Sequence, residues 1–261
     1  MDYSQIKLEV RDRLAHLTLA RPDHGNAIAL ELAEELADAA GRLAEEREVG
    51  AVLLAAEGAN FCVGGDVKTF ATRERLPEYL RPLATALHTG VSRLARLDVP
   101  LIAAVQGAAA GAGMSLACAA DFVIAADTAR FTMAYTKIGL SPDGGSSYFL
   151  SRIVGMRRAL ELVITNRVLT AEEARDWGIV TRVVPAAELA RAAREIAAPL
   201  AAGATGALRA AKRLVRDGWS ESLETQLEQE TRAIVEASRS ADAREGIAAF
   251  GERRPPRFRG E

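Results

Sequence analysis

The chain has 261 residues, of which 49% are hydrophobic and 26% charged, and its net charge is -2. This length is near the size at which a single hydrophobic core stops growing, so we expect one domain with a small appendage. The low net charge and an aromatic content of 5% argue against a nucleic-acid-binding surface, because such surfaces are basic and often stack aromatic rings on bases.

The sequence gives no sign of a membrane partner. The apolar runs near Leu53, Leu101 and Val123 are all interrupted before they reach membrane-spanning length. The start, Met1-Asp2-Tyr3-Ser4, does not resemble a signal peptide. We therefore expect cytoplasmic localisation.

Cysteines and histidines do not form a recognisable metal motif. Cys62 and Cys118 lie in apolar or glycine-rich surroundings, which favours free buried thiols, as in a reducing cytoplasm. The histidines, His16, His24 and His88, are scattered without ligand spacing. We predict no metal and no permanently bound cofactor.

Predicted strands alternate with predicted helices along most of the chain, which indicates an α/β fold with right-handed crossovers. A capping box of Thr170 with Glu173 starts a short helix that stops at Gly178. The other predicted strands are 6–10, 14–20, 51–56, 101–105, 122–126 and 180–184, and the other predicted helices are 30–46, 83–97 and 114–119.

Beyond Pro185 the sequence is almost wholly helical, near residues 188–200, 206–216 and 222–250. Helices that one core cannot cover usually bury their apolar stripe on a partner, although a cap on the same subunit is the alternative. We predict a core of residues 1–200 and a helical oligomerisation region of residues 201–261.

Two loops rich in small residues follow predicted buried strands. They are Gly58-Ala59-Asn60-Phe61-Cys62-Val63-Gly64-Gly65-Asp66 and Gln106-Gly107-Ala108-Ala109-Ala110-Gly111-Ala112-Gly113-Met114-Ser115-Leu116. Unpaired N–H groups in such loops can bind an anion or form an oxyanion hole. A phosphate loop is disfavoured because its lysine is missing, whereas close packing of a helix on a sheet remains an alternative.

A third loop, Gly139-Leu140-Ser141-Pro142-Asp143-Gly144-Gly145, places one carboxylate between helix-breaking residues. Asp143 can therefore face a pocket and is the first candidate for the reactive group. Pro-Asp-Gly is also an ordinary turn, in which Asp supplies only a local hydrogen bond.

Together these motifs resemble the crotonase superfamily, the enoyl-CoA hydratases and isomerases. The resemblance covers nearly the whole chain in the same order, through Arg21-Pro22 with Asn26-Ala27, Phe61-Cys62-Val63-Gly64-Gly65-Asp66, and residues 100–113, 121–125, 139–145, 152–155 and 171–184. It implies a spiral of strand-strand-helix units and an acyl-CoA thioester substrate, in a homotrimer or a dimer of trimers.

The resemblance also implies site residues. The N–H groups of Gly65 and Ala112 would form the oxyanion hole. The implied CoA-binding residues are Ala27, Cys62, Gly64 and Asp66, with Phe250 and Arg254 from the arginine-rich C-terminus. The early CoA loop, residues 23–28, has no arginine or lysine, so phosphate contacts must come from elsewhere.

Two departures decide the expected activity. Where hydratases of the family carry two glutamates, this chain has Ser115 and Tyr135, so the usual addition of water lacks its acid and base. Asp143 lies where several isomerase branches carry their single acid. We therefore predict an enoyl-CoA isomerase, with Tyr135 donating to Asp143, in an apolar pocket also lined by Ala86, Leu87, His88 and Ser115.

Residues 147–178 are also similar to 4-chlorobenzoyl-CoA dehalogenase, which implies Asp143 as nucleophile and His88 as base. The aromatic residues that enclose the ring in that enzyme are replaced here by Gly65 and Leu87, which disfavours dehalogenation. A lone histidine on an apolar helix is more often a packed residue. The alternatives left open are a hydratase, a dehalogenase and a non-catalytic acyl-CoA-binding protein.

Overall fold

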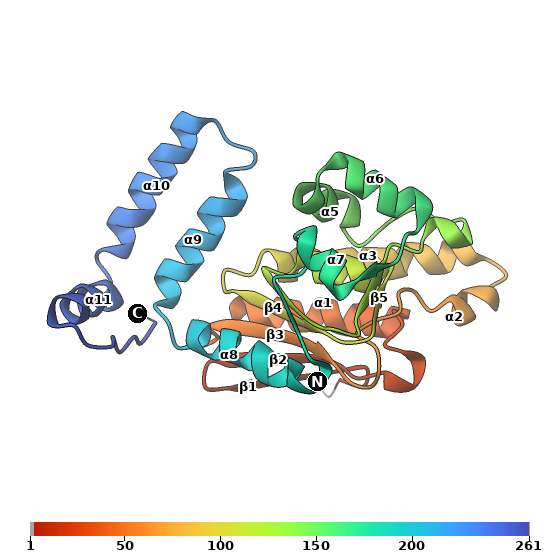
Figure 1. Ribbon diagram of the computed structural model, residues 1–261, viewed down its shortest axis with the longest axis horizontal. Coiled ribbons are helices and arrows are strands. Elements are labelled where there is room, and N and C mark those ends of the chain that lie inside the picture. The colour runs from red at the N-terminus through yellow and green to blue at the C-terminus, as the bar shows by residue number, and fades with distance from the viewer. Residues whose placement is uncertain (1–2, 261) are drawn as a thin grey trace.

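The computed structural model describes residues 3–260, and a six-stranded sheet lies at its centre (Figure 1). The first two strands pair antiparallel, and all other neighbours in this sheet are parallel. In spatial order the strands are β1 (Ile6–Arg11), β2 (Leu14–Leu19), β3 (Ala51–Ala56), β4 (Leu101–Val105), β6 (Phe122–Ala126) and β9 (Arg182–Val184).

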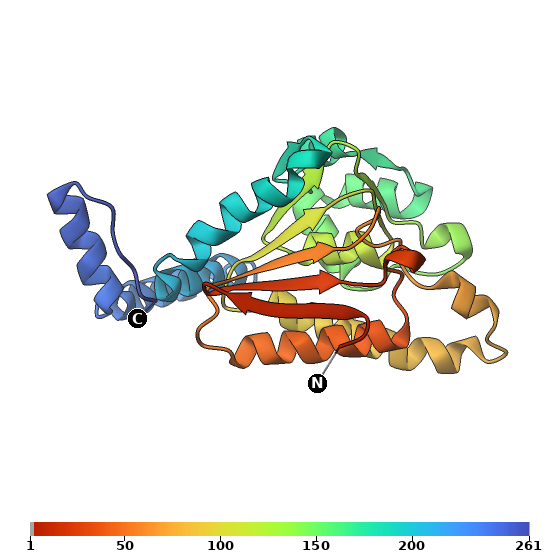
Figure 2. The ribbon, with the colours of Figure 1, turned by 90° about the horizontal axis from the view of Figure 1, so that it is seen from below.

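The central strands β3, β4 and β6 are buried on both faces, which explains why they are continuously apolar. Helices α1 (Leu30–Glu45) and α3 (Leu76–Ala95) lie on one side, and α8 (Leu189–Ala201) crosses the other (Figure 2). Along β3, Val52 and Leu54 belong to the larger core, whereas Leu53 packs toward α8. The alternation follows the two-residue period of a strand.

A smaller sheet stacks beside the first and contains β5 (Ala108–Ala110), β7 (Arg130–Thr132) and β8 (Leu169–Thr170). The chain passes from β4 through β5 into α4 (Ala112–Ala119), and from β6 through β7 toward α5 (Ser146–Val154). Each of these two segments contributes one strand to the larger sheet, one strand to the smaller sheet and then a helix. The predicted α/β spiral of strand-strand-helix units is confirmed.

Most predicted elements are confirmed, with several differences in their bounds; the predicted strand 180–184, for example, begins at Arg182. Helix α3 begins at Leu76 rather than at residue 83, with Pro77 in its first turn, where the missing N–H costs no helical hydrogen bond. Helix α4 begins at Ala112, two residues earlier than predicted. The segment 222–250 contains two helices because Ser240 caps a second one through the N–H of Ala243.

The C-terminal helices extend away from the sheets at one end of the molecule (Figure 1). They are α9 (Thr205–Asp217), α10 (Leu223–Ala237) and α11 (Ala241–Glu252). Their exposed large apolar side chains include Val215, Leu223, Leu227, Ile234, Ile247 and Phe250. This surface fits the predicted oligomerisation region, which stays a prediction together with the division at residue 200. Within residues 3–260, every helix is too short or too polar to cross a bilayer.

Candidate active site

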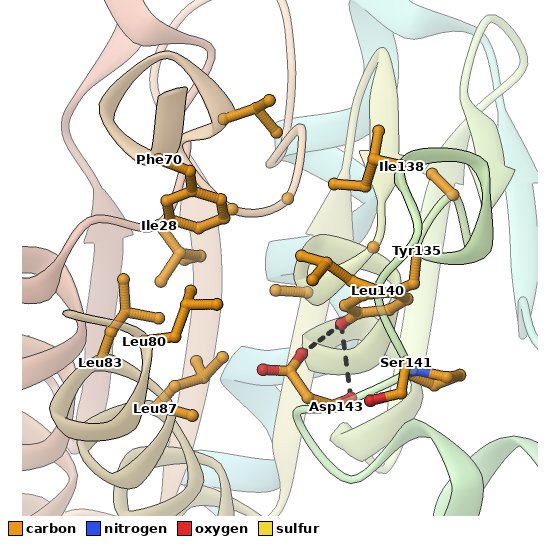
Figure 3. Close-up of a pocket in the computed structure, with 18 of the residues that line it drawn as sticks. Ile28, Phe70, Leu80, Leu83, Leu87, Tyr135, Ile138, Leu140, Ser141 and Asp143 are labelled. Atoms are coloured by element: carbon orange, nitrogen blue, oxygen red, sulfur yellow. Dashed lines mark hydrogen bonds between the residues drawn. The ribbon is translucent and has the colours of Figure 1, made fainter. Parts of the chain in front are cut away.

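An apolar cavity of about 450 Å³ lies between α3 and the loop that follows β7. One wall comes from α3 and the short helix α2 (Val67–Ala71), and the facing wall comes from residues 134–143 (Figure 3). The side chains labelled on the two walls are Ile28, Phe70, Leu80, Leu83 and Leu87 on one side, and Tyr135, Ile138, Leu140, Ser141 and Asp143 on the other. Glycine-rich backbone closes the space between them.

The wall formed by α3 shows what the sequence interpretation missed. Leu80, Ala84 and Leu87 follow the helical spacing of one face and line the cavity. Ala86, which we expected in the pocket, does not line it. We expected residues 70–80 to shape the pocket as a loop; Phe70 and Leu80 do line it, but the chain from Leu76 onward already belongs to α3. Extending the apolar period backward would have identified Leu80.

The two predicted oxyanion donors both line the cavity. Ala112 is the first residue of α4, so its N–H has no partner inside the helix, and Gly65 lies in the loop after β3. Within residues 3–260, neither N–H donates to a protein acceptor. The pair is therefore free to bind a ligand oxygen.

The backbone holds these two loops close together. Cys62 bridges Ala109 in parallel, with the Ala110 N–H donating to the Cys62 carbonyl at 2.9 Å. A Cβ on Gly113 would lie 2.1 Å from that carbonyl oxygen, so no side chain fits there. The glycines therefore permit the close approach that brings the N–H groups of Gly65 and Ala112 to one cavity.

A buried ion pair fixes the loop that carries Gly65. The Arg21 guanidinium lies 2.8 Å from the Asp66 carboxylate, and both side chains are largely buried. Asp66 also caps α2 by accepting the Thr69 N–H. Burial pushes the pKa of Asp66 upward, but the Thr69 N–H and Arg21 outweigh it and lower the pKa below its usual range.

Asp143 enters the cavity from the turn before α5, and its side chain is 29% exposed. The Tyr135 hydroxyl donates to Asp143 Oδ1 at 2.6 Å, as predicted (Figure 3). Burial raises the pKa of Tyr135, and the Asp143 carboxylate raises it further. The phenol thus remains a proton donor, and it holds the carboxylate in one orientation with Oδ2 left for a substrate.

The backbone is strained next to this phenol. Ala134 has φ +53°, a left-handed conformation that costs a residue with a Cβ free energy. The Tyr135 N–H donates to the Met133 carbonyl at 2.6 Å across this turn. The turn directs Tyr135 toward Asp143, which the sequence could not reveal because alanine carries no signal for positive φ.

His88 lies at the rim of the cavity, with its side chain 51% exposed. Its Nε2 accepts the Gly144 N–H at 3.1 Å and lies 3.9 Å from Asp143 Oδ2. In this geometry the Nε2 lone pair is occupied by a backbone donor, so His88 holds the turn that carries Asp143 and does not present a free base.

Four predicted site residues lie behind the cavity surface. Ser115 is fully buried and bonds to Tyr135, while Cys62 is fully buried beneath the oxyanion loop. Burial raises the pKa of the Cys62 thiol to about 12, so it stays protonated. Ala27 and Asp66 are buried around Arg21, whose guanidinium bonds to both. Of the predicted CoA contacts, only Gly64 lines the cavity.

The two predicted C-terminal contacts are not brought to the cavity within one chain. Phe250 is on α11 and is 88% exposed, and Arg254 follows that helix, paired with Glu245 and Glu252. Figure 1 places α11 at the end of the molecule opposite α2.

No cluster of three metal-ligating side chains occurs in the part of the chain that the structure describes. The arrangement is instead two free backbone donors facing an apolar cavity with one oriented carboxylate. It can stabilise an oxyanion while a proton moves to or from a neighbouring carbon.

Comparison with known proteins gives consistent matches over the whole chain. The family model described as "Enoyl-CoA hydratase/isomerase" matches residues 9–261. A probable enoyl-CoA hydratase from Rhodobacter capsulatus is 40% identical over all of both chains. The 1,2-epoxyphenylacetyl-CoA isomerase of Escherichia coli is 37% identical over 94% of each chain.

Two further matches extend this picture. The 4-chlorobenzoyl coenzyme A dehalogenase-2 of Arthrobacter sp is 35% identical, over 94% of this chain and 90% of the relative. The crystal structure of an enoyl-CoA hydratase from Polaromonas sp. JS666 superimposes with a TM-score of 0.92 at 36% identity, over 97% of this chain and 99% of the other. Relatives with different named reactions therefore share this fold.

Proposed function

Because the chain belongs to the enoyl-CoA hydratase/isomerase family, whose members act on acyl-CoA thioesters, we propose that it is an enoyl-CoA isomerase. It moves a double bond of the acyl group by proton transfer through an enolate. The single observation that carries this proposal is the number of carboxylates at the cavity. Among the described residues that line the cavity, those of the segment 3–260, Asp143 alone has a carboxylate.

One carboxylate is sufficient for isomerisation. Asp143 Oδ2 removes a proton from one carbon, and the same oxygen returns it to another carbon once the double bond has shifted. Oδ1 stays bonded to the Tyr135 hydroxyl throughout. The N–H groups of Gly65 and Ala112 bind the thioester oxygen as the enolate charge develops on it.

Hydration requires more than this site offers. A hydratase must activate water and also protonate the α-carbon, which usually takes two groups. The two glutamate positions of the hydratases hold Ser115 and Tyr135, and both hydroxyls are hydrogen bonded next to Asp143. This observation favours the isomerase over the activity in the name of the Rhodobacter relative.

Dehalogenation is the second candidate because Asp143 and His88 lie 3.9 Å apart at the cavity and a dehalogenase is among the relatives. In that reaction Asp143 attacks the aromatic ring and His88 helps hydrolyse the resulting ester. Two features oppose it here. His88 Nε2 accepts the Gly144 N–H. Gly65 and Leu87 also stand where the resemblance to the dehalogenase implies ring-enclosing aromatic residues, so Phe70 and Tyr135 are the aromatic side chains among the described residues that line the cavity.

A panel of CoA thioesters tests the reaction type, comprising 3-enoyl, 2-enoyl, ring-epoxide and 4-chlorobenzoyl substrates. Conversion of 3-enoyl-CoA to the conjugated 2-enoyl isomer, followed by ultraviolet absorbance, is the expected result. Tight binding of the whole panel without any turnover would instead support a non-catalytic acyl-CoA-binding protein.

The His88→Ala variant separates the isomerase from the dehalogenase. An isomerase should keep its turnover to within about 10-fold, since His88 carries no proton in the proposed reaction and its loss removes one hydrogen bond to the turn of Asp143. After incubation with 4-chlorobenzoyl-CoA, intact-protein mass spectrometry should find no added mass. An aryl adduct on the peptide that contains Asp143 would establish the dehalogenase instead.

We also propose a homotrimer or a dimer of trimers, in which Phe250 and Arg254 of one copy contact the CoA held by another. Two observations support this arrangement: the exposed apolar side chains of α9–α11 and the distance of α11 from the cavity within one chain. Sedimentation analysis tests the assembly. Loss of CoA affinity in Arg254→Ala would test the contact.

A further inference from the structure

Ser115 has one hydroxyl proton and three oxygen atoms within reach. It is the fourth residue of α4 and is fully buried. Its Oγ lies 3.2 Å from the Gly111 carbonyl, 3.0 Å from the Asp143 carbonyl and 3.1 Å from the Tyr135 hydroxyl. Since a serine hydroxyl donates only one proton, these acceptors compete for it.

The direction of the contact with Tyr135 follows from counting protons. The phenol has one proton and donates it to Asp143 Oδ1 at 2.6 Å. Between the two hydroxyls, Ser115 must therefore be the donor and Tyr135 the acceptor. Donation by Ser115 makes the phenol a stronger donor to the carboxylate, because linked hydrogen bonds polarise one another.

The contact with Gly111 reaches the oxyanion hole. The Gly111 carbonyl and the Ala112 N–H belong to one peptide group, so a proton donated to that carbonyl strengthens the N–H as a donor. The Ser115 N–H already donates to the same carbonyl at 3.0 Å. The Ser115 hydroxyl thus contacts the peptide group of the oxyanion donor Ala112 and also, through Tyr135, is linked to the proton carrier Asp143.

We infer that Ser115 is a positioning residue that couples the oxyanion hole to Asp143 in the reaction proposed above. Before the reaction, the Ser115 hydroxyl donates its proton to the Tyr135 oxygen, which strengthens the hydrogen bond that Tyr135 donates to the ionised Asp143 carboxylate. When Asp143 Oδ2 takes the substrate proton, Oδ1 becomes a weaker acceptor, and the Ser115 proton turns toward Gly111. It then strengthens the Ala112 N–H while the enolate oxygen is charged.

Ser115 also fits a purely structural role. Serine in a helix often donates to the carbonyl four residues earlier, as Ser115 does to Gly111, with no role beyond satisfying its hydroxyl. If Ser115 has only this structural role, it should behave like Ser146. Ser146 is a second fully buried serine, and its hydroxyl donates to the Asp143 carbonyl at 3.0 Å. No bond links Ser146 to Tyr135 or Gly111, which makes it a matched control.

The experiment measures kcat, KM and the pH profile of 3-enoyl-CoA isomerisation for Ser115→Ala, Tyr135→Phe, the double variant and Ser146→Ala. Ser115→Ala should lower kcat by about 10-fold, the effect of one lost hydrogen bond, with KM nearly unchanged. The fall of kcat/KM at low pH, its acid limb, should move to higher pH in Ser115→Ala and further in Tyr135→Phe. Tyr135→Phe loses the hydrogen bond to the ionised Asp143 carboxylate, and Ser115→Ala loses the bond that strengthens it.

The double variant should be much less impaired than the product of the two single effects, since both act through one chain of hydrogen bonds. Ser146→Ala should keep kcat and the acid limb of the parent. Circular dichroism over the same pH range measures the folded fraction of each variant, because a destabilised variant that unfolds in acid would also move the limb to higher pH. Equal behaviour of Ser115→Ala and Ser146→Ala, or independent effects in the double variant, would overturn the coupling while leaving the isomerase intact. A parent protein that does not isomerise any enoyl-CoA would overturn the proposed function itself.

Discussion

The buried pair of Arg21 and Asp66 allows a quantitative test of how the oxyanion loop is held. Removal of the guanidinium in Arg21→Met leaves the Asp66 carboxylate, which is 5% exposed, without its counter-charge and also leaves the Ala27 carbonyl unpaired. An uncompensated buried charge of this kind costs about 3–5 kcal/mol of unfolding free energy. For a chain of this size, that corresponds to a fall in Tm of roughly 6–20 °C.

Chemical denaturation followed by circular dichroism measures this loss, and two variants control it. Arg11 pairs with Glu9 on the surface, with side chains 74% and 56% exposed, so Arg11→Met should cost at most about 1 kcal/mol. Adding Asp66→Asn to Arg21→Met removes the orphaned charge but keeps the α2 cap, and should restore much of the stability. If Arg21→Met is no less stable than Arg11→Met, the pair does not hold the loop.

Three further predictions follow from the site. The pKa of Asp66 is lowered in the folded protein, so its contribution to stability is complete above the unfolded pKa of about 3.9 and is lost as pH falls through the folded pKa. Urea titrations of the parent and of Asp66→Asn should therefore show a difference in unfolding free energy that shrinks over this pH range. A difference that grows as pH falls would contradict the prediction. Ala112→Pro removes one N–H at the first position of α4, where a helix tolerates proline, so the protein should fold. Its kcat should fall about 100-fold because one oxyanion donor is lost. Near-normal turnover would show that the Ala112 N–H has no part in the reaction. Crotonyl-CoA should be hydrated poorly, and turnover on the order of 10³ per second would refute the isomerase assignment.

Much of the fold could be predicted because its signals are local. The buried strands are continuous apolar runs, and the capping box at Thr170 forms with both of its hydrogen bonds. The oxyanion loops were recognised because glycine marks positions where backbones approach closely, as at Gly113. Asp143 was recognised for a similar reason, since helix-breaking residues surround it.

The parts that could not be predicted depend on contacts between distant segments. Ser115 was placed in the pocket, but it is fully buried behind Tyr135, because Tyr135 and the turn at Asp143 pack over its hydroxyl. Residues 70–80 were expected to shape the pocket as a loop, but the sequence did not show that Phe70 belongs to α2, because this five-residue helix is too short for a periodic signal. The bond from Gly144 to His88 likewise joins segments 56 residues apart.

Proton exchange at the substrate carbon tests the central claim that Asp143 carries the proton. The parent protein and Asp143→Asn are incubated with a 3-enoyl-CoA in D₂O, and the deuterium content of product and recovered substrate is measured by mass spectrometry. Because the Asp143 side chain is 29% exposed, part of its acquired protons should exchange with solvent before they are returned, so we expect the parent to form the 2-enoyl isomer with partial incorporation of deuterium. Asp143→Asn should bind the thioester but show neither reaction, since an amide cannot take up the proton. Isomerisation at the parent rate by Asp143→Asn would contradict the account.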